Sequence, residues 1–327
     1  MSIKDQVLAL FNNETKVSFD DICYQIFKLQ STHNKVYNQY LEILGTDINS
    51  INSIEDIPLL PISCFKYNDV KTGKWDSNHF FLSSGTTLNR RSRHWVKDMD
   101  WYKAVSKEIF KYFFQMDDHM HICGLLPGYV DNPSSSLIHM VNSFIESFGA
   151  TGSRIYNLQI DAMKNDLIKY DRSFLFAVTF AILDLVSQVK LEDIQPTVCF
   201  TGGMKGRGEE LAFAEVVTLI KKAIPNATVC AEYGMTELFS QAYAKENGIY
   251  KEAPTMRVMP KEITDPLSNA SNQRSAQLGI IDLANIDTVS FILTDDLVNK
   301  SFEGFEILGR LDYSDVRGCN LMYLEAN

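Results

Sequence analysis

The stretch ATVCAEYGMTE (residues 227–237) decides the fold class of this chain. Its first half is a short, continuous apolar run, as expected for a strand that is covered on both faces. Its second half is a polar turn that contains a glycine. A similar strand and turn, PTVCFTGG (196–203), comes before it, and segment 209–225 between the two has a helical pattern. Strand, helix and strand in this order predict a parallel sheet with helices on both faces.

The same alternation extends upstream. Between residues 98 and 114 the apolar side chains Trp101, Val105, Ile109 and Tyr112 recur at helical spacing, which predicts an amphipathic helix. Further predicted strands are 121–127 and 174–178, and further predicted helices are 134–149 and 179–189.

These patterns predict an α/β fold of layered sheets in one compact unit with three parts. Residues 1–78 form an N-terminal helical segment, residues 79–235 form the α/β core, and residues 236–327 form a β-rich subdomain. Short strand-like runs separated by polar turns indicate the subdomain; they are GIIDLAN (279–285), VSFILTDD (289–296) and FEILGR (305–310).

Composition limits the classes of function. The chain has 327 residues, of which 45% are hydrophobic and 22% charged, as in globular proteins. The net charge of −10 argues against nucleic-acid or anionic-membrane binding, since both need broad basic surfaces. We expect a cytoplasmic protein, because the sequence shows neither a secretory signal nor a transmembrane segment.

The cysteines and histidines do not form a recognisable metal site. The six cysteines include no C-x-x-C pair, which fits a reducing compartment. Cys123, Cys199 and Cys230 lie in apolar strands and are predicted to be buried packing residues. His119 and His121 alternate along a predicted strand without a third ligand nearby, so we interpret them as strand-edge histidines.

A third polar turn lies in FLSSGTTLNRRSRH (81–94), where hydroxyl side chains surround Gly85 and arginines follow at 90, 91 and 93. This composition suits a small polyanion, although an ordinary surface turn has a similar one. Ligands of open α/β sheets bind beyond the carboxyl ends of the strands. We therefore expect this turn and the turns after residues 200 and 231 to follow equivalent strand ends and to face one crevice.

Five motifs in order resemble those of the adenylate-forming superfamily, which activates carboxylic acids with ATP. They are SSGTT (83–87), TGG (201–203), EYGMTE (232–237), TDDL (294–297) and GRLD (309–312). The phrases GLLPGYV (124–130), TGGMKGRGEE (201–210) and GRLDYSDVRGC (309–319) are most similar to LuxE-type acyl-protein synthetases, the fatty-acid-activating components of bacterial fatty acid reductases. The resemblance covers nearly everything from Phe81 to the end.

The resemblance implies the N-terminal core of an adenylate-forming enzyme, without the mobile C-terminal lid domain. It implies a magnesium-dependent ligase that converts a fatty or other carboxylic acid to an acyl adenylate. The acyl group then passes to Cys319, whose thiol lies near Arg317 in the sequence, and onward to a protein partner, either a reductase or an acyl carrier.

The resemblance also implies roles for single residues. The phosphates of ATP would be held by Ser83, Ser84, Gly85, Thr86 and Thr87 in the first motif, by Arg91 shortly after it and by Thr236 in the third motif. Gly202 and Gly203 would approach the adenine, and Tyr233 would stack on it. Glu237 would hold magnesium through a hard carboxylate oxygen. Asp296 and Arg310 would contact the ribose, although Asp295 stands where the superfamily has a glycine.

Two other functions fit the same residues. An acyltransferase could use a preformed acyl thioester without ATP, with the nucleotide pocket serving only as scaffold. A catalytically silent subunit could bind nucleotide or acyl groups to regulate a complex. Two of the assigned residues also have a structural interpretation. Tyr233 could be a core aromatic, and Glu237 could be a carboxylate favoured by a helix dipole.

Overall fold

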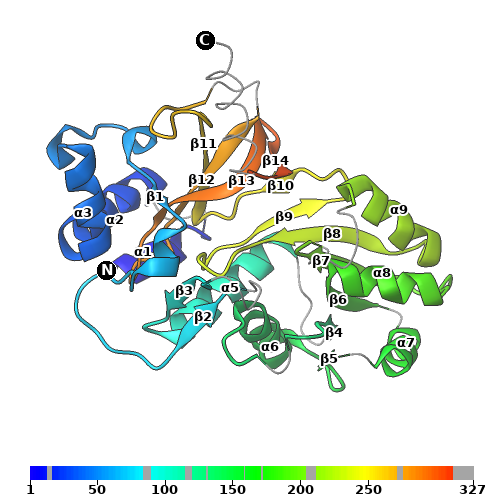
Figure 1. Cartoon of the computed structure of the whole chain (residues 1–327). Helices are drawn as coiled ribbons and strands as arrows, with labels where there is room; N and C mark the ends of the chain where they lie inside the picture. The colour runs from blue at the N-terminus through cyan, green and yellow to red at the C-terminus, as the bar shows by residue number, and fades with distance from the viewer. Residues whose placement is uncertain are drawn as a thin grey trace, which may run out of the picture.

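The computed structural model describes residues 1–12, 17–83, 90–114, 120–129, 132–157, 159–170, 172–203, 211–270 and 275–311. Within these ranges twelve strands form one twisted sheet that runs through the molecule, with helices packed on it (Figure 1). None of the helices in the described ranges combines the length and the apolar character needed to span a bilayer.

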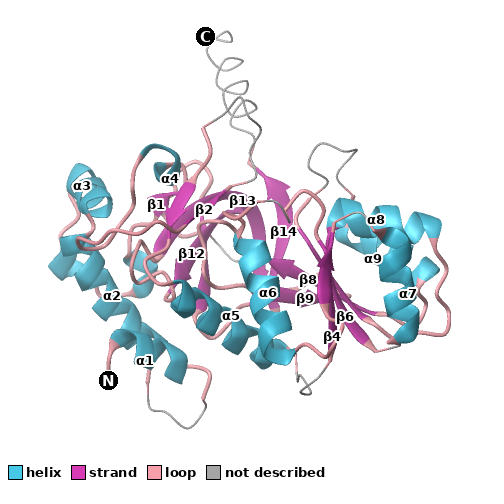
Figure 2. Ribbon diagram, turned by 90° about the horizontal axis from the view of Figure 1, so that it is seen from below, coloured by secondary structure: helices cyan, strands magenta, loops and turns pink. Residues whose placement is uncertain are grey.

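One half of the sheet is parallel, in the strand order β5–β4–β6–β7–β8. These strands are β4 (His121–Leu125), β5 (Arg154–Tyr156), β6 (Ser173–Val178), β7 (Thr197–Thr201) and β8 (Thr228–Tyr233). Helices cover both faces, α5 and α6 on one side and α7, α8 and α9 on the other (Figure 2). The helices are α5 (Met99–Phe113), α6 (Ser136–Phe148), α7 (Ile160–Lys169), α8 (Thr179–Gln188) and α9 (Phe213–Ala223).

The predicted alternation of strands and helices between residues 98 and 234 is confirmed, with bounds that differ by a few residues. Only β5 and α7 were not predicted. The α6 helix has Ser135 as its N-cap and Gly149 as its C-cap, within the predicted range of 134–149. An aromatic cluster joins α5 and α6 to the sheet: Phe110 stacks on Phe144 with ring centroids 4.3 Å apart and contacts Phe176 on β6.

The other half of the sheet is antiparallel and continues directly from β8. Its order is β8–β9–β10–β14–β13–β12–β11, so the predicted β-rich runs extend the parallel half. The strands are β9 (Ala242–Lys245), β10 (Tyr250–Lys251), β11 (Met256–Lys261), β12 (Ala276–Asp282), β13 (Phe291–Ser301) and β14 (Gly304–Arg310). The division of the chain into three parts stays a prediction.

The N-terminal helices pack on the antiparallel half. They are α1 (Ile3–Ala9), α2 (Phe19–His33), α3 (Lys35–Leu44) and α4 (Cys64–Tyr67), with short turns η1 (Ile48–Ser50) and η2 (Ile54–Asp56). Phe27 on α2 and Tyr37 on α3 each place their rings 5.7 Å from that of Phe291 on β13. Strand β1 (Leu60–Pro61) adds to β13 in parallel.

Two predictions from the sequence are wrong. The turn at 83–87 does not follow a strand of the parallel sheet, because β2 (Phe80–Leu82) and β3 (Arg93–Trp95) form a separate antiparallel hairpin around it. His121 is not at a sheet edge, because β4 lies between β5 and β6; it is 3% exposed and stacks on Tyr170. His119 lies outside the described residues.

Replacing Asp98 by alanine is expected to lower the free energy of unfolding by about 1 kcal/mol, the usual value of an N-cap. Asp98 caps α5 by accepting a hydrogen bond from the backbone N–H of Trp101 at 3.1 Å, and it also pairs with Lys4 at 2.9 Å. Denaturant unfolding measures the change. The control is Asp98→Asn, which keeps the cap and loses only the half-exposed ion pair; an equal loss in both variants would contradict the capping role.

Candidate active site

The end of β8 brings together three predicted ligand contacts. The Tyr233 hydroxyl donates a hydrogen bond to Asp296 Oδ2 at 2.7 Å, and Arg310 Nε lies 3.2 Å from Asp296 Oδ1. Asp296 and Arg310 are direct partners on β13 and β14. Burial, followed by the Asp296 charge, raises the pKa of Tyr233 well above its usual value, so its hydroxyl stays a donor. Tyr233, Asp296 and Arg310, which the motifs assign to the nucleotide, therefore form one hydrogen-bonded cluster.

Glu237 lies in the turn after β8 and is 4% exposed. Burial raises the pKa of its carboxyl group, while a hydrogen bond from the Ser92 side chain and the nearby charges of Arg310 and Lys66 act in the opposite direction. A partly desolvated carboxylate that faces cationic side chains is a hard oxygen ligand held in place. Magnesium in phosphate sites commonly binds one or two carboxylates together with the substrate phosphates, so the donor chemistry of Glu237 fits this metal.

The hairpin places the base of the phosphate-loop motif beside Glu237. Ser83 and Ser92 are joined by two hydrogen bonds, Ser83 N to Ser92 O at 3.1 Å and Ser92 N to Ser83 Oγ at 3.0 Å. Arg91 Nε donates to the Ser83 carbonyl at 2.6 Å. Because Ser92 also bonds Glu237, the start of the loop and the predicted metal ligand share one residue. Ser84, Gly85, Thr86 and Thr87 lie outside the described residues.

The three arginines predicted as one anion site have different surroundings. Arg90 lies over the ring of Tyr67 at 5.7 Å, and Arg93 lies over Phe80 at 5.2 Å. Among the described residues, Arg91 is the one of the three that bonds the backbone of the loop motif, at Ser83. Of the three, Arg91 is thus best placed to act with that motif.

The second glycine motif lies at the carboxyl end of β7, next to β8 in the sheet. Gly202 has a φ of 68°, a left-handed conformation that favours glycine, and both Gly202 and Gly203 are exposed. The Thr179 hydroxyl at the start of α8 donates to the Gly202 carbonyl and fixes the turn. The glycines thus present bare backbone at the edge where the turn after β8 also lies, as predicted.

His94 is a residue of this site that the sequence did not reveal. It is fully buried on β3, with Nδ1 2.8 Å from the Thr236 carbonyl oxygen and Nε2 2.9 Å from the Thr288 hydroxyl. A carbonyl oxygen only accepts, so Nδ1 carries the proton and Nε2 accepts from Thr288. His94 therefore joins the hairpin to the backbone of Thr236, the predicted α-phosphate contact.

The remaining predicted residues have separate outcomes. Cys319, Arg317 and Asp312 lie outside the described residues. Cys123, Cys199 and Cys230 are buried, as predicted. The part of the chain that the structure describes contains no group of three or more acidic, histidine or cysteine side chains arranged to hold a metal ion.

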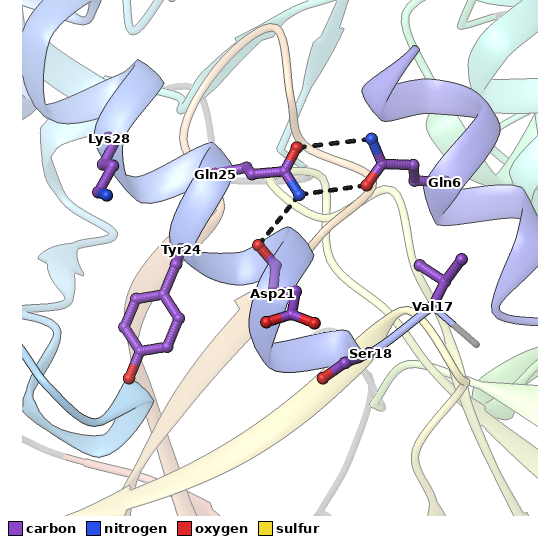
Figure 3. A pocket seen from close by; sticks show the side chains of 7 residues that line it. All are labelled: Gln6, Val17, Ser18, Asp21, Tyr24, Gln25 and Lys28. Atoms are coloured by element: carbon purple, nitrogen blue, oxygen red, sulfur yellow. Dashed lines mark hydrogen bonds between the residues drawn. The ribbon is translucent and has the colours of Figure 1, made fainter. Parts of the chain in front are cut away.

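A separate hollow of about 530 Å³ lies on α1 and α2 (Figure 3). Gln6 and Gln25 bond each other across it through their amide groups. Its lining is Gln6, Val17, Ser18, Asp21, Tyr24, Gln25 and Lys28, which includes none of the predicted site residues.

No protein-family model matches the sequence, and no curated protein matches it by sequence. Solved structures do share the fold. A 2-hydroxyisobutyryl-CoA ligase in an open conformation, in complex with 2-HIB-AMP and CoA, has a TM-score of 0.67 at 12% identity over 90% of this chain and 70% of that one.

Two other solved structures are similar at lower scores. The o-succinylbenzoate CoA synthetase from Bacillus subtilis, in complex with ATP and magnesium, has a TM-score of 0.54 at 12% identity, covering 90% of this chain and 63% of its own. Apo MatB from Rhodopseudomonas palustris has a TM-score of 0.54 at 13% identity, covering 71% and 47%. The predicted α/β fold class is confirmed, and these solved structures share the fold.

Proposed function

We propose that this chain activates a carboxylic acid with ATP as an AMP-forming ligase. The observation that carries the proposal is the cluster of Tyr233, Asp296 and Arg310 beside the buried carboxylate of Glu237. These residues come from separate parts of the sequence, and each matches a nucleotide-contact motif. The solved ligases with the same fold, one of them in complex with ATP and magnesium, support the same reading.

In the proposed reaction, a carboxylate oxygen of the acid attacks the α-phosphorus of ATP. The bond from that phosphorus to the bridging oxygen breaks, and pyrophosphate leaves with the electron pair. Bound magnesium would neutralise phosphate charge during this step, held on the protein side by Glu237. Asp296 and Arg310 would orient the ribose, and Thr236 would bond the α-phosphate. Positioning and charge stabilisation supply most of the catalysis in phosphoryl chemistry.

The acceptor of the acyl group belongs to the same proposal. The thiolate of Cys319 would attack the acyl carbon, with AMP as the leaving group, and the thioester would then pass to a reductase or acyl carrier protein. This step rests on the likeness of the C-terminal motif to acyl-protein synthetases. Acylation of the purified chain that needs ATP and disappears in Cys319→Ser would support it.

The first step is tested by acid-dependent exchange of labelled pyrophosphate into ATP. We expect exchange with at least one acid, and we expect Asp296→Asn to raise the apparent KM for ATP about tenfold, the cost of a charged hydrogen-bond partner. Asp166→Asn is a matched control, because Asp166 also binds an arginine and a tyrosine, Arg154 and Tyr156, at β5. ATP binding without exchange for any acid would contradict the proposal.

A further inference from the structure

Three polar side chains form a row across the sheet beside the proposed site. Thr201 on β7 is the register partner of Glu232 on β8, and Glu232 is the partner of Tyr243 on β9. Directly paired residues project from the same face of a sheet. The rings of Phe113 and Phe114 at the end of α5 lie 5.1 and 5.0 Å from that of Tyr243, so this face is the one beneath α5.

The Glu232 carboxyl group is held at one oxygen only. Its Oε2 accepts a hydrogen bond from the Thr201 hydroxyl, and no second hydrogen bond to the carboxyl is found among the described residues. Its Oε1 lies beside Gly234, 2.2 Å from where a Cβ on that glycine would stand. Burial raises the pKa of Glu232 to about 7. A buried carboxyl group with a free oxygen costs stability, so the fold alone does not explain it.

The free oxygen lies beside Gly234, just past the carboxyl end of β8. Gly234 is exposed, as are Gly202 and Gly203 at the end of the neighbouring strand. The carboxyl ends of parallel strands are where open α/β sheets bind ligands. Tyr233, the next residue in the chain, bonds Asp296 on β13. Successive residues of β8 thus belong to different features, Glu232 to this polar row and Tyr233 to the proposed nucleotide site.

Two more polar atoms near Glu232 have no partner in the described part of the chain. They are the Tyr243 hydroxyl and Gln241 Oε1, and both residues are only 3% exposed. Tyr243 lies within electrostatic reach of Glu232, and Gln241 Cγ lies 3.7 Å from the Cβ position of Gly234. Buried polar groups are nearly always paired, so unpaired ones around a free carboxyl oxygen indicate a polar ligand group.

We propose that Glu232 selects the acid substrate by accepting a hydrogen bond from a donor group on its acyl portion, either a hydroxyl or an ammonium group. This inference rests on the proposed acid activation and names its substrate class. A plain alkyl chain would leave the Glu232 oxygen unpaired, whereas a donor-bearing acid satisfies it. Sites built to bond a polar group reject analogues that lack it far more strongly than apolar pockets reject a missing methylene.

The test is pyrophosphate exchange by the full chain with alkanoic acids of matched length. Each acid is offered unsubstituted, with a hydroxyl and with an ammonium group at several carbons. We expect kcat/KM for the best donor-bearing acid to exceed that of its plain analogue by about 100-fold or more. Glu232→Leu is expected to bring this ratio close to one. Glu232→Gln keeps an acceptor oxygen without the charge. The variant should therefore keep its exchange activity with a hydroxy acid and lose its exchange activity with an ammonium-bearing acid.

Thr201→Val is the matched control, because it removes the hydroxyl that holds Glu232 but leaves the carboxyl in place; it should change the ratio less than Glu232→Leu does. Equal or better use of plain acids by the unmodified chain would overturn the inference while leaving acid activation intact. So would an equal loss for all acids in both Glu232 variants, with the ratio unchanged, since that indicates a structural role. Absence of exchange with every acid would overturn the proposed function and this inference with it.

Discussion

Replacing Glu237 by glutamine is expected to reduce acid-dependent pyrophosphate exchange by about two to three orders of magnitude, the usual cost of removing one group that stabilises transition-state charge. Glutamine has the shape of glutamate and can still bond Ser92, so the buried site keeps its packing. It lacks the negative charge that a magnesium ion requires. Because the loss arises at the metal, raising the magnesium concentration should recover part of the activity.

Ser92→Ala is the control for this experiment. It removes the hydroxyl that orients Glu237 but keeps the carboxylate, and changes to such supporting groups at metal sites typically cost about 10- to 100-fold. We therefore expect a smaller loss than in Glu237→Gln. Exchange above a tenth of the normal rate in Glu237→Gln, with unchanged magnesium dependence, would remove Glu237 from the proposed mechanism.

Acidification is expected to destabilise the chain through His94. Burial lowers the pKa of His94 from 6.5 to about 4, although the Thr236 carbonyl acts in the opposite direction. Between these two pKa values, His94 is protonated in the unfolded chain and neutral in the folded chain. Stability contributed by neutral His94 is complete above pH 6.5, falls as the pH drops from about 6.5 to about 4, and is constant below. The full loss is about 3 kcal/mol for this difference in pKa.

His94→Gln isolates this contribution from other titrating groups. Glutamine does not titrate, so the free energy of unfolding should fall less between neutral and acidic pH in the variant than in the unmodified chain. Denaturant unfolding at several pH values across this window measures both. Parallel pH profiles for the two proteins would show that His94 does not titrate as its burial predicts.

The alternation of the α/β core could be predicted from sequence because its signals are local. Each parallel strand except β5 is a short, mainly apolar run, and a capping residue such as Ser135 marks a helix start by bonding its own first turn. The hairpin of β2 and β3 was misplaced because its position depends on distant contacts. The same holds for β10, a strand of only two residues that lies between β9 and β14.

The site shows the same division between local and distant information. Tyr233, Glu237, Asp296 and Arg310 were predicted because each lies in a motif that resembles a known one. His94 stands between Arg93 and Trp95 without any motif, and its two partners are 142 and 194 residues away. Glu232 precedes Tyr233 directly, yet its partner Thr201 is on another strand. Only the sheet register brings them together.

The buried side chain of Gln30 on α2 has a consequence for how the chain is made. It donates to the carbonyls of Asn285 and Ile286 and accepts from the backbone of Ser290, so an early helix closes on a late loop. The 255 residues that follow Gln30, up to and including Asn285, take roughly 10 to 50 s to synthesise at ~5–20 residues per second. Through that interval the apolar faces of the first helices lack β13, their covering strand. The apolar surface of the first helices therefore stays open to aggregation until the last strands emerge.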